Sequence, residues 1–239
     1  MKKFLLAVVA LGGGLGGWGS TAAWGQVIYQ YDFGGEAGQS VLGQAPEVRP
    51  GQEVFVSPDS PTQTVQVKAN GEVSASGGSP SFYLPFRVAG KKKYVLGLDV
   101  EMKPSAPTED WYALAFTRGP LPEGDKSLAV AYSALFLIRA NGDAQFLTWG
   151  TDPAGPGTAQ LGATAGRLEI ILDNTQKNSP LATLEFRLNG KTVYQTAYAG
   201  MEYNPDTIDP ITHIGFGKFT SDFPSLPGKV GNLKLEIIP

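Results

Sequence analysis

Residues 183–196 read TLEFRLNGKTVYQT and carry the clearest structural signal in the chain. Apolar side chains alternate with polar ones up to Leu188, the Asn189-Gly190 pair follows, and Thr192 to Tyr194 continue in a second segment of the same kind. An Asn-Gly pair between two such segments is typical of a two-residue turn that joins antiparallel strands. The stretch therefore predicts a β-hairpin built from two half-buried strands.

Period-two alternation recurs along the chain, whereas helical periodicity does not. The segments KYVLGLDVEM (93–102), GRLEIILDN (166–174) and the last ten residues each place apolar side chains on one face. About twelve short strands with turn signals between them predict an all-β fold, a two-sheet antiparallel jelly-roll sandwich. Further strands are expected at 27–33, 63–68, 82–88, 111–117, 130–139, 144–149 and 212–219, and long loops at 103–110, 119–126, 150–166 and 199–210.

Residues 1–25 have the layout of a secretory signal. Two lysines precede an apolar run, and small residues lead to the segment TAAWGQ, so cleavage is expected after Gly25 or after Ala23. The apolar run is shorter than the ~20 residues of a membrane-spanning helix, which disfavours a permanent anchor. We therefore expect a single β-sandwich domain over residues 26–239, secreted or periplasmic, with no membrane insertion after signal removal.

The charge and cysteine content exclude several kinds of partner. The formal net charge is −3, and it becomes more negative without the two signal lysines. Nucleic acid and anionic membranes are therefore not expected as partners, because both require a concentrated basic surface. The one basic cluster, Lys91-Lys92-Lys93, is expected to be a solvated turn. The chain has no cysteine, so neither a disulfide nor a lipid-modified cysteine stabilises or anchors it.

Several segments, in this order, resemble the concanavalin A-like jelly-roll domains of the laminin-G type in secreted bacterial proteins. They are YDFGGEAGQSVLGQAPE, SFYLPFRVAGKKKYVLGLDV, DWYALAFT, FLIRANGDAQ, RLEIILDNT, LEFRLNGKTVYQTAY, HIGFGKF and GKVGNLKLEII. The resemblance implies that the NGK hairpin edges one sheet. Such domains include lectins, glycan-binding modules, glycosidases, polysaccharide lyases and adhesive domains, so the fold does not choose among these functions. A sorting tail of the Pro-Glu-Pro type is not found, which favours a freely released or periplasmic protein.

Enzymatic chemistry has little support in the sequence. A retaining glycosidase needs two carboxylates in one cleft, and the Glu-x-Asp-x-x-Glu pattern is not present. The nearest approach is Asp99 and Glu101, whose alternative role is the solvent face of a strand. The single histidine, His213, lacks the surrounding pattern of an alginate lyase, and no Gly-x-Ser-x-Gly elbow is present. The protein is therefore expected to be non-catalytic, and a polysaccharide-active enzyme is the third hypothesis.

A metal site is a sharper alternative. The run EYNPDTIDPITHIG, residues 202–215, resembles the calcium and manganese loop of legume lectins. Asn204, Asp206, Asp209 and His213 would supply ligands, and calcium would be the ion if the oxygen ligands converge. Against this, the run comes just before the last strands, whereas the lectin loop lies elsewhere in the chain order, and the Asp-Pro and Pro-Asp pairs are also typical of turns.

Glycan binding is the leading hypothesis. An aromatic ring can cover the apolar face of a sugar while amide and carboxylate groups bind its hydroxyls. Trp149 is the first candidate because it precedes the long loop, and Asp152 and Gln145 are close in sequence. Trp111 and Tyr112 come next, and packing of these rings in the core is the alternative for each. The second hypothesis is a structural or adhesive surface domain that binds protein or itself.

Overall fold

The computed structural model describes residues 25–35, 39–56, 65–67, 73–75, 81–102, 111–117, 132–148, 157–176, 181–198, 211–218 and 229–239. Within these ranges the backbone forms strands joined by turns and irregular segments. No helix in them is long and apolar enough to cross a membrane.

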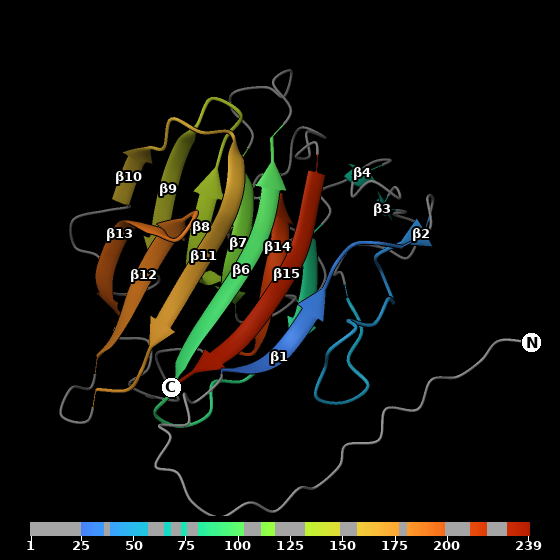
Figure 1. Ribbon diagram of the computed structural model, residues 1–239, viewed down its shortest axis with the longest axis horizontal. Helices are drawn as coiled ribbons and strands as arrows, with labels where there is room; N and C mark the ends of the chain where they lie inside the picture. The colour runs from blue at the N-terminus through green and yellow to red at the C-terminus, as the bar shows by residue number, and fades with distance from the viewer. Residues whose placement is uncertain are drawn as a thin grey trace, which may run out of the picture.

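Two six-stranded antiparallel sheets lie face to face. We call the sheet that contains β1 and β15 sheet 1 and the sheet that contains β7 and β8 sheet 2, and sheet 1 lies in front of sheet 2 in Figure 1. This arrangement confirms the predicted all-β sandwich. In order across sheet 1 the strands are β1 (Gln26–Tyr31), β15 (Lys229–Ile238), β6 (Lys93–Glu101), β11 (Ala165–Asp173), β12 (Ala182–Leu188) and β13 (Lys191–Tyr198). Across sheet 2 they are β10 (Gly157–Gln160), β9 (Asp143–Thr148), β8 (Tyr132–Ile138), β7 (Tyr112–Thr117), β14 (His213–Lys218) and β5 (Ser81–Pro85).

A small third sheet joins β2 (Gln39–Ser40), β3 (Val65–Val67) and β4 (Val73–Ala75). It lies beyond the end of β1 in Figure 1, to the side of the two large sheets.

The main core fills the space between the two large sheets. Successive side chains of a strand point to opposite faces, so the alternating apolar residues of β12 all point inward. Phe186 of β12 is fully buried and meets Phe136 and Phe146 of sheet 2, with ring centroids 6.0 and 5.2 Å away. Tyr194 of β13 stacks on Phe146 at 5.1 Å, with the two ring planes 10° apart. Aromatic contacts therefore join the two sheets at the β12–β13 edge.

The predicted hairpin is confirmed. Leu188 pairs with Lys191, which leaves Asn189 and Gly190 as a two-residue turn with φ angles of 52° and 76°. Positive φ at both positions is the requirement of a type I′ turn, which Asn-Gly satisfies. The Asn189 Oδ1 atom also accepts a hydrogen bond from the Arg167 backbone N–H at 2.8 Å. This bond ties the turn to the neighbouring strand β11.

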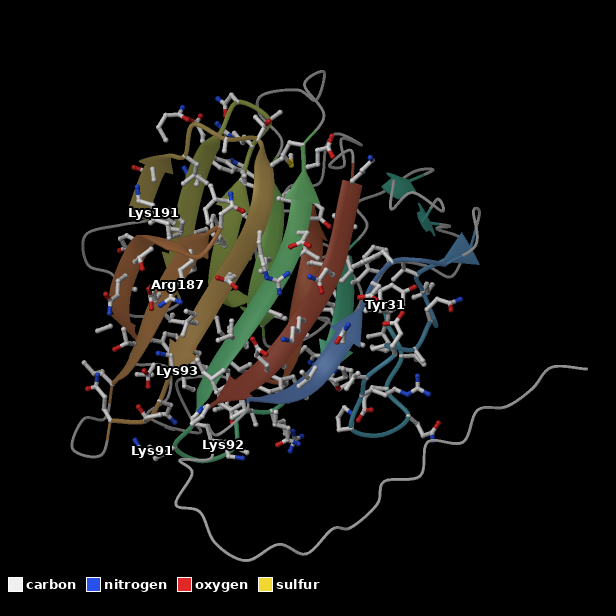
Figure 2. The ribbon with its side chains drawn as sticks, viewed as in Figure 1. Tyr31, Lys91, Lys92, Lys93, Arg187 and Lys191 are labelled. Carbon is white, nitrogen blue, oxygen red and sulfur yellow. The ribbon has the colours of Figure 1, made fainter. Side chains whose placement is uncertain are left out.

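Sheet 1 presents a charged outer face to solvent, visible in Figure 2. Its ion pairs form both between and within strands: Lys93 of β6 pairs with Asp173 of β11 at 3.5 Å, and Arg187 pairs with Glu185 of the same strand at 2.7 Å. The Arg187–Glu185 pair is bidentate and partly buried, with Nε and Nη2 donating to the two carboxylate oxygens at 2.7 and 3.0 Å. Of the predicted solvated turn, Lys91 and Lys92 are exposed before β6, whereas Lys93 is the first residue of that strand and is partly buried.

One predicted loop is wrong in part. The segment 150–166 was expected to be a loop throughout, but Gly157–Gln160 form strand β10 at the edge of sheet 2. In a Gly/Pro-rich segment, four residues are too few for an alternation of apolar and polar side chains to predict a strand. Their extended conformation comes from pairing with β9. This strand supplies part of the candidate site.

Candidate functional site

The outer face of sheet 2 carries a second, smaller apolar cluster. Tyr83, Trp111, Ala113, Ala115, Leu135 and Leu137 form it, and each is buried. Because side chains alternate along each strand, β7 and β8 contribute apolar residues to the main core and to this cluster at once. Toward β9 and β10 the same face becomes polar.

A pocket of about 400 Å³ lies at this polar end, and we call it the β9–β10 pocket. In the sheet register Thr158 is opposite Gln145, and Gln160 is opposite Asp143. Cross-strand partners lie on the same face, so these four side chains form two adjacent polar pairs. The pocket is lined by Trp111, Arg139, Asp143, Ala144, Gln145, Thr158, Ala159 and Gln160.

Asp143 is held in place by the turn that precedes β9. The Asn141 Nδ2 atom donates to Asp143 Oδ2 at 2.7 Å, and the Asp143 backbone N–H donates to Asn141 Oδ1 at 2.9 Å. The Gln160 Nε2 atom donates to Asp143 Oδ1 at 2.5 Å. Gly142 has a φ of 83°, the conformation that closes a three-residue hairpin loop. The carboxylate therefore organises one wall of the pocket.

Arg139 forms another wall and has an unsatisfied donor. Its guanidinium carbon lies 3.8 Å from the centre of the Trp111 ring, a cation–π contact. Its Nη1 atom is 3.9 Å from Asp143 Oδ2. The Nε–H group is buried and has no hydrogen-bond partner within the described part of the chain. Buried donors are normally paired, so this group is suited to an incoming oxygen acceptor.

Gln145 and Thr158 add unused hydrogen-bonding capacity. Over the described residues the structure gives neither side chain a hydrogen-bond partner. A primary amide supplies two donors and an acceptor, and a hydroxyl supplies both functions. Together with Arg139 Nε–H, the pocket offers donors and acceptors at positions fixed by adjacent strands.

Comparison with known proteins identifies the architecture. No protein-family model and no curated protein matches the sequence. Among solved structures, an endo-1,3-beta-glucanase from Streptomyces sioyaensis superposes with a TM-score of 0.57 at 10% identity, over 94% of this chain and 99% of that one. The chain has the concanavalin A-like jelly-roll fold. At this identity the likeness shows the fold alone.

Two further solved structures match this jelly roll with lower scores. The Emp46p carbohydrate recognition domain in its metal-free form gives a TM-score of 0.48 at 13% identity, over 87% of this chain and 97% of that one. A legume lectin-like domain from Entamoeba histolytica gives 0.41 at 15% identity, over 83% and 95%.

The jelly roll brings two of the predicted site residues together. Gln145 and Trp111 both line the β9–β10 pocket, whereas Trp149 and Asp152 lie outside the described residues. Trp111 is only 6% exposed, and Arg139 covers one face of its ring. Trp111 therefore positions the guanidinium and does not offer that face to a sugar.

Sequence reasoning missed the other polar residues of the pocket. Arg139 and Asp143 lie close to the Asn141-Gly142 pair, a turn signal in the sequence, but only the register of β9 and β10 places them beside Thr158 and Gln160. These residues were missed because residues 157–160 were assigned to a loop from the sequence, and strand β10 was not predicted.

Tyr112 is not a binding residue. It points to the inner face of β7, is 2% exposed and belongs to the main core of the jelly roll. Burial raises the pKa of its hydroxyl far above the ordinary value. The expectation that Tyr112 contacts a ligand is therefore wrong, because its ring packs between the sheets.

The predicted metal loop is described only at its end. Asn204, Asp206 and Asp209 lie outside the described residues, and His213 begins β14. Its Nδ1 atom is 2.8 Å from the Thr212 hydroxyl, and its ring meets Tyr83 edge to face. Among the described residues no group of three or more acidic or histidine side chains is placed to hold a metal ion. Calcium binding at this loop stays a prediction.

Asp99 and Glu101 lie on the outer face of sheet 1, away from the β9–β10 pocket. Both line a pocket of about 460 Å³, and Asp99 Oδ1 is 2.9 Å from Arg167 Nη1. The same nitrogen donates to the Asn232 carbonyl at 3.1 Å. Arg167 thus engages one of the two carboxylates in a surface ion pair, the solvent-face role considered for Asp99.

His213 is expected to titrate below its ordinary pKa. Burial lowers this pKa first, and the nearby positive charge of Arg87 lowers it further. The unfolded chain keeps a pKa of about 6.5, so the histidine's contribution to stability is full above that pH and is lost as the pH falls toward the folded pKa. His213 is the chain's only histidine, so NMR of a preparation without a histidine tag would follow one imidazole.

The expected midpoint of that titration lies below 6.5. A His213→Gln variant should not show the loss of stability that protonation of His213 causes as the pH falls. A midpoint above 6.5 would contradict the burial of the ring as described.

Proposed function

We propose that this protein is a secreted carbohydrate-binding protein whose sugar site is the β9–β10 pocket. The observation that carries the proposal is the buried, unpartnered Arg139 Nε–H beside the unused Gln145 amide and Thr158 hydroxyl. A sugar presents several hydroxyl and ring oxygens within a few ångströms of one another. Amides, carboxylates and guanidinium groups at fixed positions are the partners such oxygens need.

In this arrangement each residue has a defined part. Arg139 would donate from its guanidinium to a ring or hydroxyl oxygen, while Trp111 holds the guanidinium in place. Gln145 and Thr158 would bind two neighbouring hydroxyls from the strand pair. The volume of about 400 Å³ lies in the ordinary range of small-ligand sites and suits one or two sugar residues.

Support for the sugar class also comes from the fold. The endo-1,3-beta-glucanase that shares the jelly roll acts on a polysaccharide according to its name. The signal-like first 25 residues support the proposal that the protein works outside the cytoplasm, where polysaccharides are available.

The test is binding of the mature protein to a panel of polysaccharides and oligosaccharides, followed by calorimetry on the best ligand. Gln145→Ala and Arg139→Gln are expected to weaken binding about tenfold each, since each removes hydrogen bonds in a partly buried site. Gln195→Ala, on an exposed position of β13, is the matched control and should bind within twofold of the parent. Trp149→Ala tests the predicted stacking residue in the same series.

Two outcomes would contradict the proposal. Absence of binding to every glycan would favour the adhesive or structural role, and unchanged affinity in both pocket variants would move the site elsewhere. Runs with calcium and with a chelator test the predicted metal loop, since a loss of binding with chelator points to residues 202–215. Shortening of the polymer during the assay would instead favour the enzyme hypothesis.

A further inference from the structure

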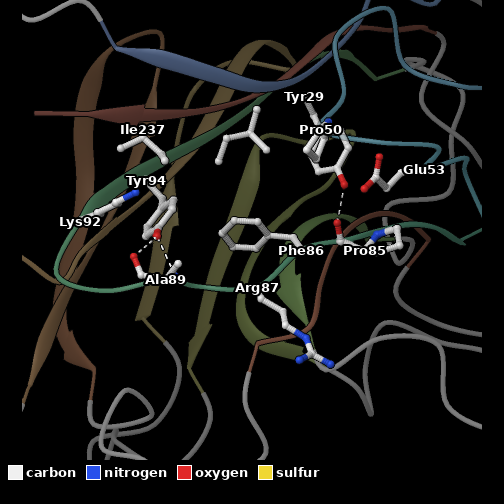
Figure 3. Close-up of a pocket in the computed structure, with 11 residues that line it drawn as sticks. Tyr29, Pro50, Glu53, Pro85, Phe86, Arg87, Ala89, Lys92, Tyr94 and Ile237 are labelled. Atoms are coloured by element: carbon white, nitrogen blue, oxygen red, sulfur yellow. Dashed lines mark hydrogen bonds between the residues drawn. The ribbon is translucent and has the colours of Figure 1, made fainter.

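A second pocket lies at the end of the sandwich, where sheet 1 meets the connection 86–92 between β5 and β6 (Figure 3). Its volume is about 350 Å³, within the range of small-molecule sites. It shares no lining residue with the β9–β10 pocket. We call it the end pocket.

The end pocket has an aromatic floor and apolar sides. Phe86 and Tyr94 meet edge to face with centroids 5.3 Å apart, and Tyr29 lies on the other side of Phe86 in Figure 3. Ile28 and Ile237 from β1 and β15 are only partly buried against the core. A ligand that covers this partly exposed apolar surface removes it from water, which lowers the free energy of the complex.

The connection that walls the pocket is fixed by side-chain hydrogen bonds. The Tyr29 hydroxyl donates to the Pro85 carbonyl at 2.5 Å, and the Tyr94 hydroxyl both donates to and accepts from the Ala89 backbone at 2.9 Å. Asn174 Nδ2 donates to the Gly90 carbonyl at 3.1 Å. Burial raises the pKa of both tyrosines, so their hydroxyls stay protonated donors at neutral pH. A wall held at three points is formed before any ligand arrives, which lowers the entropic cost of binding.

The mouth of the end pocket is positively charged on the side of Tyr94. Lys92 and Arg87 are exposed, and over the described residues neither forms an ion pair. Figure 3 shows the Lys92 side chain extending toward Tyr94, whereas the Arg87 guanidinium points away from the aromatic rings. The one acidic lining residue, Glu53, accepts a hydrogen bond from the Gly51 N–H at 2.6 Å. Lys92 is thus the cation available to a ligand here, on a chain whose net charge is −3.

We propose that the end pocket binds an aryl carboxylate of one or two rings. The ring would lie against Phe86, Ile28 and Ile237, and the carboxylate would pair with the Lys92 ammonium. A rigid ring fits a wall that is already fixed, whereas a flexible acyl chain loses more rotational freedom on entering a pocket of this size. Carboxylate and ammonium form charge-assisted hydrogen bonds, which are stronger than neutral ones.

The probe is 2-naphthoate, titrated into the mature protein by calorimetry and ligand-observed NMR. Saturable binding at one site is expected, with the uncharged 2-naphthamide at least fivefold weaker. Lys92→Gln should weaken 2-naphthoate about fivefold, as expected for an ion pair at a solvated rim. Lys91→Gln removes the same charge from an exposed neighbour that does not line the pocket, and should change the affinity less than twofold.

A blocking variant provides an independent readout. Ala89 is exposed at the mouth and is held through its backbone, so Ala89→Trp should narrow the pocket without breaking those hydrogen bonds. Loss of 2-naphthoate binding in this variant, with an unchanged thermal transition, supports the site. The proposal is overturned if no saturable binding occurs, if both lysine variants lose affinity equally, or if 2-naphthamide binds as tightly. Tighter binding of octanoate than of 2-naphthoate would overturn the aryl assignment.

Discussion

Replacing Phe186 with alanine is expected to lower the free energy of unfolding by about 3–5 kcal/mol. The side chain has no exposed surface and contacts the rings of Phe136, Phe146 and Tyr194. These contacts come from both sheets, so the surrounding structure cannot collapse into the space without moving one sheet relative to the other. Urea denaturation should show a lower midpoint with an unchanged m-value.

The control for this experiment is Phe186→Leu, which keeps most of the volume and should cost less than about 1.5 kcal/mol. A loss below about 1 kcal/mol in the alanine variant would mean that Phe186 does not join the two sheets as described.

Replacing Gly157 with alanine is expected to damage both the fold and the candidate sugar site. A Cβ atom at this position would lie 2.6 Å from the Tyr194 ring, closer than real Cβ atoms approach. Tyr194 cannot easily withdraw, because it stacks on Phe146. Strand β10 must then shift, and it carries Thr158 and Gln160 of the β9–β10 pocket. We expect a loss of about 1–3 kcal/mol in stability, typical of overpacking.

Calorimetry on the best glycan should show weaker binding by the folded Gly157→Ala protein, and amide hydrogen exchange should be faster in β9 and β10. Gly34→Ala is the matched control, because nothing lies within 4 Å of its added carbon. Tyr194→Leu in the Gly157→Ala background should recover part of the lost stability. Purely additive effects of the two substitutions would contradict a direct clash between them.

The strands of sheet 1 could be predicted because one face of each is solvated. In β12 the alternation of buried and partly exposed residues is complete, and the Asn189-Gly190 turn sets the pairing with β13 as far as Arg187, where the register shifts by one residue. In sheet 2 the pattern differs, since all six residues of β7 are buried on both faces. Its apolar run still predicts a strand, but nothing in the run reveals which side faces the main core.

The site was less predictable than the fold because it depends on neighbours that are distant in sequence. Gln145 and Trp111 were recognised as residue types suited to sugars. The decisive feature is the stacking of Arg139 on Trp111 with its Nε–H unpaired, which requires β7 and β8 to lie side by side. No local pattern encodes that contact. Tyr112 was predicted as a binding residue together with Trp111, its neighbour in sequence. The two side chains point to opposite faces of sheet 2, and Tyr112 packs in the main core.

The pairing of β1 with β15 has a consequence for the order of assembly. β15 lies between β1 and β6, so the first strand has no partner in sheet 1 until the last strand is in place. The contact between Gln26 and Ile237 closes nearly the whole chain into one loop. Such non-local pairing slows folding, since the entropy of closing the loop is lost before the contacts form. A chain emerging from a ribosome must therefore expose β15 before sheet 1 can close, and until then the edge of β1 that faces β15 has no partner.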